Sequence, residues 1–259
     1  MGTSRSSSGA GGGVPLVPSW VESGNAGQPV QAPPPVAPPR RFASTRRATA
    51  TLFGSNASSA ARHVLGSYVR HGYGGSATAA RRFGSAATAA AGLYGFLSGA
   101  PQAAPALATF NLKNLSSLST QDQIAAIAAA VWPSNQTLDD AAQRTAMCEA
   151  LAELASKEPT LDFAAMSTEH ATEVFILALA FGIFETFRLD IGKTIQEKAN
   201  GNHAQEQSVL SAIRSTLVEV VRGEVTRLQA QTGLNAGTSA AIAVTAIAAV
   251  TAIFEEEVR

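Results

Sequence analysis

The second half of the chain repeats apolar residues with the period of α-helices. Residues 167–198 have a centre, VFILALAFGIF, that is apolar all round, which predicts a central buried helix. Residues 203–231 place Val209 and Ile213 on one side, as in an amphipathic helix. The last stretch, residues 238–258, is apolar for about fifteen residues, fewer than the roughly twenty that span a bilayer. We therefore expect a buried bundle helix there rather than a membrane span.

Start and stop signals bracket two further helices. Ser119, followed three positions later by an aspartate, has the pattern of an N-terminal cap, and a Trp-Pro pair ends the apolar run behind it. The next helix is expected to begin after Thr137 and to end before Pro159. With the three helices above, these elements predict an acidic all-helical domain over residues 101–259.

Residues 42–100 differ from this pattern, because small residues alternate with arginines and occasional aromatic residues. The stretch SATAARRFGSAATAAAGLYGFLSG is typical of a helix rich in alanine and glycine. Each interior glycine costs about 1 kcal/mol relative to alanine, so such a helix needs other structure to pack against. We predict a basic, Ala/Gly-rich helical segment here.

Residues 1–41 contain eight of the twelve prolines, together with glycine and serine runs. Proline removes backbone donors and Gly/Ser tracts raise the entropic cost of ordering, so we predict a disordered arm. An apolar island, VPLVPSWVES, lies inside it. Extended proline-containing peptides lose little entropy when they bind a groove, which favours docking to a partner. The candidate partner-binding residues of the island are Leu16, Val17, Pro18 and Trp20.

The patterns together predict an all-α fold, a helical bundle preceded by a disordered Gly/Ser/Pro-rich N-terminal arm. Apolar residues make up 46% of the chain but aromatic residues only 6%, a balance that favours close-packed helices over sheets. The expected domains are the arm 1–41, the basic helical segment 42–100 and the acidic helical domain 101–259.

The formal net charge of zero hides a division of charge along the chain. Residues 1–100 carry nine arginines and one acid, a net charge of +8, whereas the remainder carries ten cations and eighteen acids, a net charge of −8. Such asymmetry indicates separate partners for the two halves, or one half that binds the other. Arg81, Arg82 and Phe83 are candidate partner-binding residues of the basic half. That partner is either an acidic protein surface or nucleic acid.

Motifs of catalysis are missing from the sequence. It contains no phosphate-binding loop, no GxSxG elbow, no HExxH and no dinucleotide-binding glycine signature. The four histidines have no partners at metal-ligand spacing. We expect no catalytic residues, no metal and no intrinsic cofactor. The single cysteine and the absence of an apolar signal segment at the start favour a cytoplasmic protein without a membrane association.

The beginning of the chain, MGTSRS, offers one reactive group. Removal of the initiator methionine leaves Gly2 with a free α-amine, whose reference pKa of about 7.7–8.0 keeps an appreciable fraction unprotonated near neutral pH. Glycine has no side chain to obstruct a narrow enzyme pocket. Gly2 is therefore a candidate acceptor for N-terminal modification. The same residues also fit the N-myristoylation pattern.

Several segments resemble one known family of proteins. They are the start MGTS, the island PLVPSWVES, the segment SYVRHGYGGSATAARRFGSAATAAAGLYGFLSG and the sequence FRLDIGKTI in the long apolar helix. In these segments the chain resembles the QatB family, subunits of the bacterial Qat anti-phage defence system. The likeness extends over nearly the whole chain and is most specific in PLVPSW and TAARRFGS.

The resemblance implies partners and a function. It implies an ATPase (QatA), a QueC-like enzyme (QatC) and a TatD-like nuclease (QatD). QueC enzymes activate a 7-deazaguanine carboxylate with ATP, and a relative could pass the activated acid to a protein amine. The expected role is a non-enzymatic subunit that binds QatC and presents Gly2 for a covalent 7-deazaguanine-type adduct. The alternative is a nucleic-acid-binding adaptor that uses the Arg/aromatic segment 42–83 to serve the nuclease.

Overall fold

The structure is a computed structural model that describes part of the chain. The described residues are 15–17, 36–38, 40–54, 57–99, 115, 117–133 and 136–258. Gly2, Pro18 and Trp20 lie outside them, as does most of the predicted disordered arm. The predicted boundary between residues 100 and 101 also lies outside them.

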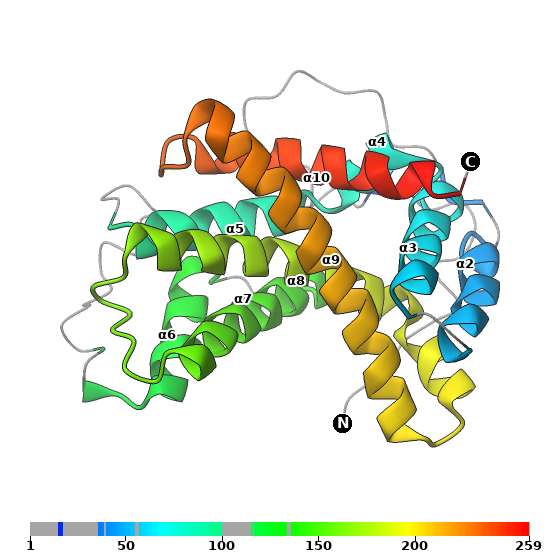
Figure 1. Ribbon diagram of the computed structural model, residues 1–259, viewed down its shortest axis with the longest axis horizontal. Helices are drawn as coiled ribbons and strands as arrows, with labels where there is room; N and C mark the ends of the chain where they lie inside the picture. Colours follow the sequence, from blue (N-terminus) through cyan, green and yellow to red (C-terminus); the bar gives the residue numbers. More distant parts are fainter. Residues whose placement is uncertain are drawn as a thin grey trace. The chain divides into compact units, whose positions relative to one another are not determined.

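The described residues form α-helices and no β-strand, which confirms the all-α prediction. One 3-10 turn, Thr49–Phe53, and one π-helical turn, Tyr68–Gly72, interrupt the first helices. The helices (Figure 1) are α2 Ala43–Ala48, α3 Ala57–Ser67, α4 Ser76–Arg82, α5 Gly84–Leu97, α6 Thr120–Val131, α7 Leu138–Lys157, α8 Thr168–Ala199, α9 His203–Thr232 and α10 Ser239–Glu256.

Contacts within the chain divide it into two compact units, each made of separate stretches of sequence. Unit 1 comprises Met1–Gly84, Thr186–Val220 and Ile247–Arg259. Unit 2 comprises Ser85–Glu185 and Val221–Ala246. The sequence of unit 1 carries fourteen lysines and arginines against eight acids, and that of unit 2 carries five against eleven. The charge division noted in the sequence therefore persists between the units, as +6 against −6.

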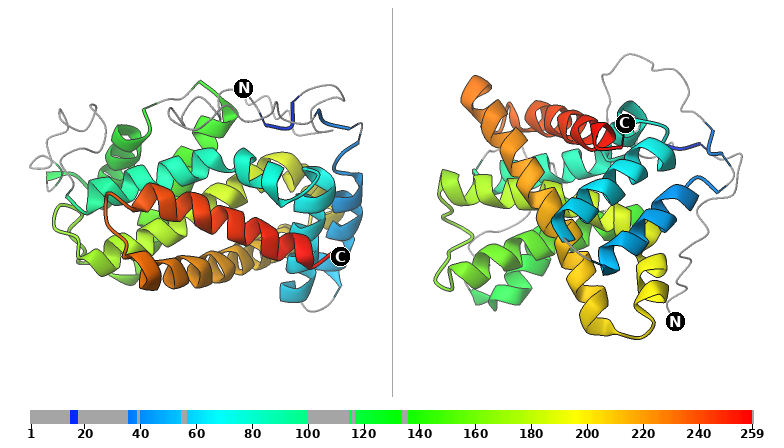
Figure 2. Two further views of the ribbon diagram at one scale, coloured as in Figure 1. Left: turned by 90° about the horizontal axis from the view of Figure 1, so that it is seen from above. Right: turned by 45° about the vertical axis from the view of Figure 1, so that its right-hand side comes forward.

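In unit 1 the first helices pack against one another and against the end of α10. Helices α2 and α3 lie side by side (Figures 1 and 2). Gly66 of α3 lies so close to α10 that a Cβ atom there would come within 2.5 Å of the backbone oxygen of Phe254. Arg62 of α3 forms ion pairs with Glu219 and Glu257, at 3.0 and 3.5 Å. Residues 40–84 thus pack with C-terminal segments, as their glycine content requires.

Unit 2 contains the elements with the clearest capping signals. Ser119 accepts a hydrogen bond from the backbone N–H of Asp122 at the start of α6, as predicted. Thr137 and Asp140 form a reciprocal capping box that begins α7. Helix α8 has a near-contact at Gly182, where a Cβ atom would lie 2.6 Å from the Cβ of Ala86. The two caps are each formed within a single turn, which explains why the starts of α6 and α7 match the sequence pattern closely.

Helix α10 is, within the described part of the chain, the helix that is long and apolar enough to cross a membrane. Of its residues, 44% are buried within the protein, and a core helix of a folded protein passes the same test of length and composition.

Candidate functional site

A polar cluster of unit 1 joins two tyrosines to one carboxylate. The hydroxyls of Tyr68 and Tyr73 each donate a hydrogen bond to Oδ2 of Asp190, both at 2.7 Å. Tyr68 is the first residue of the π-helical turn that follows α3, Tyr73 comes directly after that turn, and Asp190 lies in α8. Both tyrosines are at most 1% exposed. One carboxylate thus links segments that are more than a hundred residues apart in sequence.

Aromatic rings enclose this polar contact. The ring centroids of Tyr68 and Tyr73 lie 5.2 Å apart in an edge-on arrangement, and that of Phe187 lies 5.0 Å from Tyr68. Edge-on pairs of this kind add about 0.5–1.5 kcal/mol beyond the burial of their surface. We call this group the aromatic cluster; its members are Phe42, Tyr68, Tyr73, Phe83 and Phe187.

The surroundings keep both tyrosines in the protonated form. Burial, which penalises the charged phenolate, raises the pKa of Tyr68 and of Tyr73 well above the ordinary value, and the negative charge of Asp190 raises it further. Arg82 lowers the pKa of both tyrosines, but less than these two causes raise it. The hydroxyls therefore act as hydrogen-bond donors, and Asp190 acts as the acceptor.

Backbone geometry explains how the two tyrosines converge. The π-helical turn widens the helix after Ser67, and π-helical turns inside α-helices occur frequently at functional sites. Gly72 lies against Phe42, where a Cβ atom would come within 2.7 Å of the ring. Gly75, at φ +126°, then redirects the chain into α4, as glycine can do without strain. The backbone N–H of Ser76 donates to Glu255 at 2.9 Å and holds this turn.

The candidate site residues of the sequence are buried, half-buried or outside the described part of the chain. Leu16 and Val17 are 3% and 0% exposed, so these two positions are buried within the chain itself. Arg82 and Phe83 are buried as well, and Phe83 belongs to the aromatic cluster. Arg81 is half-buried and keeps part of its side chain accessible. Gly2, Pro18 and Trp20 lie outside the described residues.

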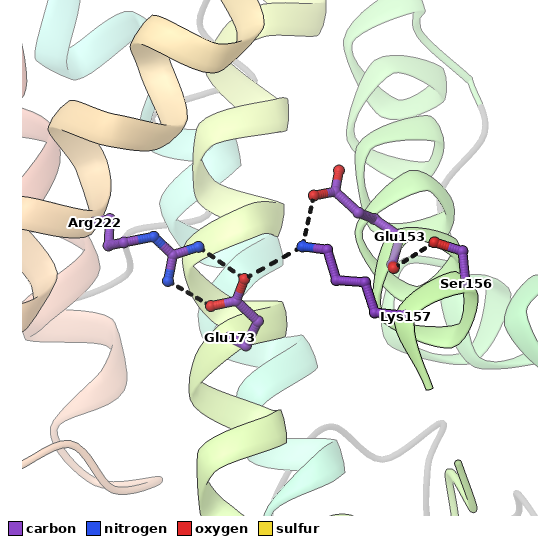
Figure 3. Close-up of polar contacts among 5 residues, drawn as sticks. All are labelled: Glu153, Ser156, Lys157, Glu173 and Arg222. Atoms are coloured by element: carbon purple, nitrogen blue, oxygen red, sulfur yellow. Dashed lines mark hydrogen bonds and ion pairs between the residues drawn. The ribbon is translucent and has the colours of Figure 1, made fainter. Parts of the chain in front are cut away.

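A second polar cluster, in unit 2, joins three helices (Figure 3). Arg222 of α9 donates two hydrogen bonds to the carboxylate of Glu173 in α8, at 2.5 and 2.7 Å. Lys157 of α7 lies 4.0 Å from the same carboxylate and 3.1 Å from Glu153. The hydrogen bonds from Arg222 lower the pKa of Glu173, despite an opposing effect of burial. We call these four residues the charged network.

Sequence patterns did not reveal the central members of either cluster. The segment FRLDIGKTI contains Asp190, but a lone aspartate in a long helix has no local signal that marks it as an acceptor for two tyrosines. Glu173 binds Arg222, which lies 49 residues further along the chain, and no local pattern relates the two. His170 lies 2.9 Å from the carboxylate of Glu158.

The arrangement of both clusters is suited to holding helices together. Within the described residues no group of three or more histidine, cysteine, aspartate or glutamate side chains is placed to hold a metal ion. The carboxylate of Asp190 accepts from two buried hydroxyls, and that of Glu173 binds a guanidinium. These contacts define an all-helical protein whose described polar clusters join segments distant in sequence.

Comparison with known proteins identifies the family. The family model described as "Qat anti-phage system associated protein QatB" matches residues 74–254, which is more than half of the chain. The chain therefore belongs to the QatB family, and its role lies in anti-phage defence. Comparison with curated proteins and with solved structures gave no match.

Proposed function

We propose that this chain is a non-enzymatic, cytoplasmic subunit of the Qat system that binds the QueC-like enzyme QatC and presents Gly2 to it for a deazaguanine-type conjugation. The match of residues 74–254 to the QatB family supports this proposal, because the resemblance to that family implies a QueC-like enzyme in the same system. QatA and QatD are further partners within the same system.

The burial of Leu16 and Val17 supports a presented N-terminus. These two residues are buried, whereas the neighbouring Pro15 is exposed and forms an antiparallel bridge with Val36, a residue of the same arm. The buried pair fixes one point of the arm. Fully extended, the chain between Gly2 and Pro15 spans at most about 45 Å. An enzyme that binds within this distance of Pro15 can receive the α-amine in its active site.

The conjugation needs only the amine from this chain. The QueC-like enzyme activates the 7-deazaguanine carboxylate with ATP. The unprotonated amine of Gly2 attacks the activated carbonyl carbon, an amide bond forms, the activating group leaves and the amine loses a proton to solvent. The side chains of the described clusters take no part, in agreement with their structural contacts.

The mass of the N-terminal peptide tests the proposal. Co-expression with the QueC-like enzyme should increase that mass by one acyl group, and omission of the enzyme should leave it unchanged. Gly2→Leu, which obstructs the pocket and retains the initiator methionine, should abolish the increase. Ser7→Ala, a change in the same arm that spares the amine, should not. An unmodified N-terminus in cells whose Qat defence is active would refute the conjugation.

A further inference from the structure

Arg41 is held in place by aromatic rings rather than by a carboxylate. Its guanidinium carbon lies 4.4 Å from the ring centroid of Phe42 and 5.1 Å from that of Tyr73. Both rings are at most 1% exposed and belong to the aromatic cluster, so they form a fixed support. A guanidinium on such a support loses little freedom when its N–H groups bind an anion.

The charge of Arg41 has no ion-pair partner among the residues that the structure describes. Its Nε is enclosed and makes no hydrogen bond there, although the side chain as a whole is half-exposed. The carboxylate of the aromatic cluster, Asp190, already accepts from two tyrosine hydroxyls. An anion from outside the chain that binds the exposed part of the guanidinium would supply the missing counter-charge.

Three further arginines of unit 1 with accessible side chains belong to segments near Arg41 in the sequence or in contact with α2. Arg40 is exposed and adopts a left-handed backbone with φ +57°, a conformation that is uncommon outside glycine and enriched at ligand-binding sites. Arg47 is exposed on α2, and Arg70 is half-exposed on the π-helical turn that packs against α2. The segment 40–84 contains eight arginines, no lysine and no acid.

We propose that Arg41, with Arg40, Arg47 and Arg70, forms a surface that binds the phosphate backbone of nucleic acid. Arginine forks match phosphate oxygens, and a run of arginines without interspersed acids suits a chain of regularly repeated negative charges. Aromatic rings can stack on nucleic-acid bases, but Phe42 and Tyr73 are buried beneath Arg41 and are therefore not accessible to bases. Binding should therefore depend on phosphate contacts and be independent of base sequence.

Fluorescence anisotropy with the full chain tests this surface. The probe is a single-stranded DNA of mixed sequence, about 30 nucleotides long, so that it exceeds the site of one binding module. Affinity should fall steeply between about 50 and 200 mM salt. In Arg41→Gln/Arg47→Gln, the slope of log affinity against log salt should decrease by about 1 to 2, because each lost phosphate contact removes about 0.7.

Three single variants separate phosphate binding from general charge and from folding. Arg62→Gln removes one positive charge from an arginine that is ion-paired in unit 1, and its salt slope should match that of the unchanged protein. Arg41→Lys keeps the charge but loses the planar fork, so affinity should drop at least about threefold with an unchanged slope. Arg47 is exposed, so Arg47→Gln alone reports on binding without an effect on packing.

Four results would overturn the proposal. The first is absence of binding at about 25 mM salt, where phosphate contacts are strongest. The second is equal salt slopes for Arg41→Gln/Arg47→Gln and Arg62→Gln. The third is tighter binding of polyglutamate than of DNA, which would assign the surface to an acidic protein partner. ATP at the same phosphate concentration should compete weakly, because one nucleotide reaches few of the arginines. Strong competition by ATP is the fourth and would point to a nucleotide site instead.

Discussion

Asp190 in unit 1 and Glu173 in unit 2 are carboxylates with the same general task and different surroundings. Each lies on α8 and binds side chains from other segments. Asp190 accepts from two buried, neutral hydroxyls, whereas Glu173 binds a guanidinium whose side chain is 42% exposed. Water and salt screen the second contact more than the first, because both tyrosines are buried while Asp190 is half-buried. Unit 1 should therefore depend on its carboxylate more than unit 2 does.

The largest effect is expected from the rings around Asp190. Phe83→Ala removes a 1%-exposed ring that packs against Tyr68 and Tyr73, and should destabilise the protein by about 3–5 kcal/mol. Denaturant unfolding measures the loss. Phe53→Ala, at a half-buried ring of the same unit, is the matched control and should cost less than half as much. Equal losses of stability in Phe83→Ala and Phe53→Ala would show that the aromatic cluster stabilises the protein no more than an ordinary half-buried ring does.

Asp190→Asn tests the carboxylate that accepts from the two buried tyrosines. The amide oxygen can still accept a hydrogen bond but carries no charge, so the two tyrosine hydroxyls lose a charged acceptor, at a cost of about 1–3 kcal/mol. Hydrogen exchange resolved by peptide should report faster opening of residues 57–83 and little change in α7. Equal acceleration in α7 would contradict the assignment of the contact to unit 1.

Alkaline pH should act on the same contact. Because burial raises the folded-state pKa of Tyr68 and Tyr73, the unfolded chain loses these protons first as pH rises. Their contribution to stability is complete below pH about 10 and decreases above it, by up to about 1.4 kcal/mol per pH unit for each tyrosine. The denaturation midpoint measured from pH 8 upward should follow this course, and Tyr68→Phe/Tyr73→Phe should flatten it. An unchanged alkaline slope in that variant would contradict the linkage.

The smallest effect is expected in the charged network. Glu173→Gln should cost only about 0.5–1 kcal/mol, because the partner side chains are partly exposed. Arg222 lowers the folded-state pKa of Glu173, so this contribution is present above pH about 4.3 and is lost as pH falls through the lowered pKa. High salt should reduce the difference in free energy of unfolding between Glu173→Gln and the unchanged protein. A cost equal to that of Asp190→Asn would remove the distinction between the units.

The parts of the fold that depend on local chemistry could be predicted. The caps at Ser119 and Thr137 are formed within single turns, and the starts of α6 and α7 agree with them. The long apolar run over residues 167–198 predicted the helix Thr168–Ala199. Gly2, Pro18 and Trp20 remain predictions, because they lie outside the described residues.

The contacts of the candidate sites could not be predicted in this way. Tyr68 meets Asp190 across 122 residues, and Arg222 meets Glu173 across 49. Phe83 was singled out as a partner-binding candidate, and the structure adds that its ring is buried among Tyr68 and Tyr73. Local sequence patterns show that a side chain is apolar or charged. They do not show which distant segment that side chain contacts in the folded protein.

The amino-acid sequence by itself determined the helices, their caps, the division of charge and the likeness to the QatB family. These properties follow from hydrogen bonds and side-chain spacing within a few turns, or from composition. The tertiary structure alone decided that Arg41 rests on Phe42 and Tyr73, and that Asp190 accepts from two tyrosines. Such contacts depend on which helices pack together, because packing brings together side chains that no local period relates.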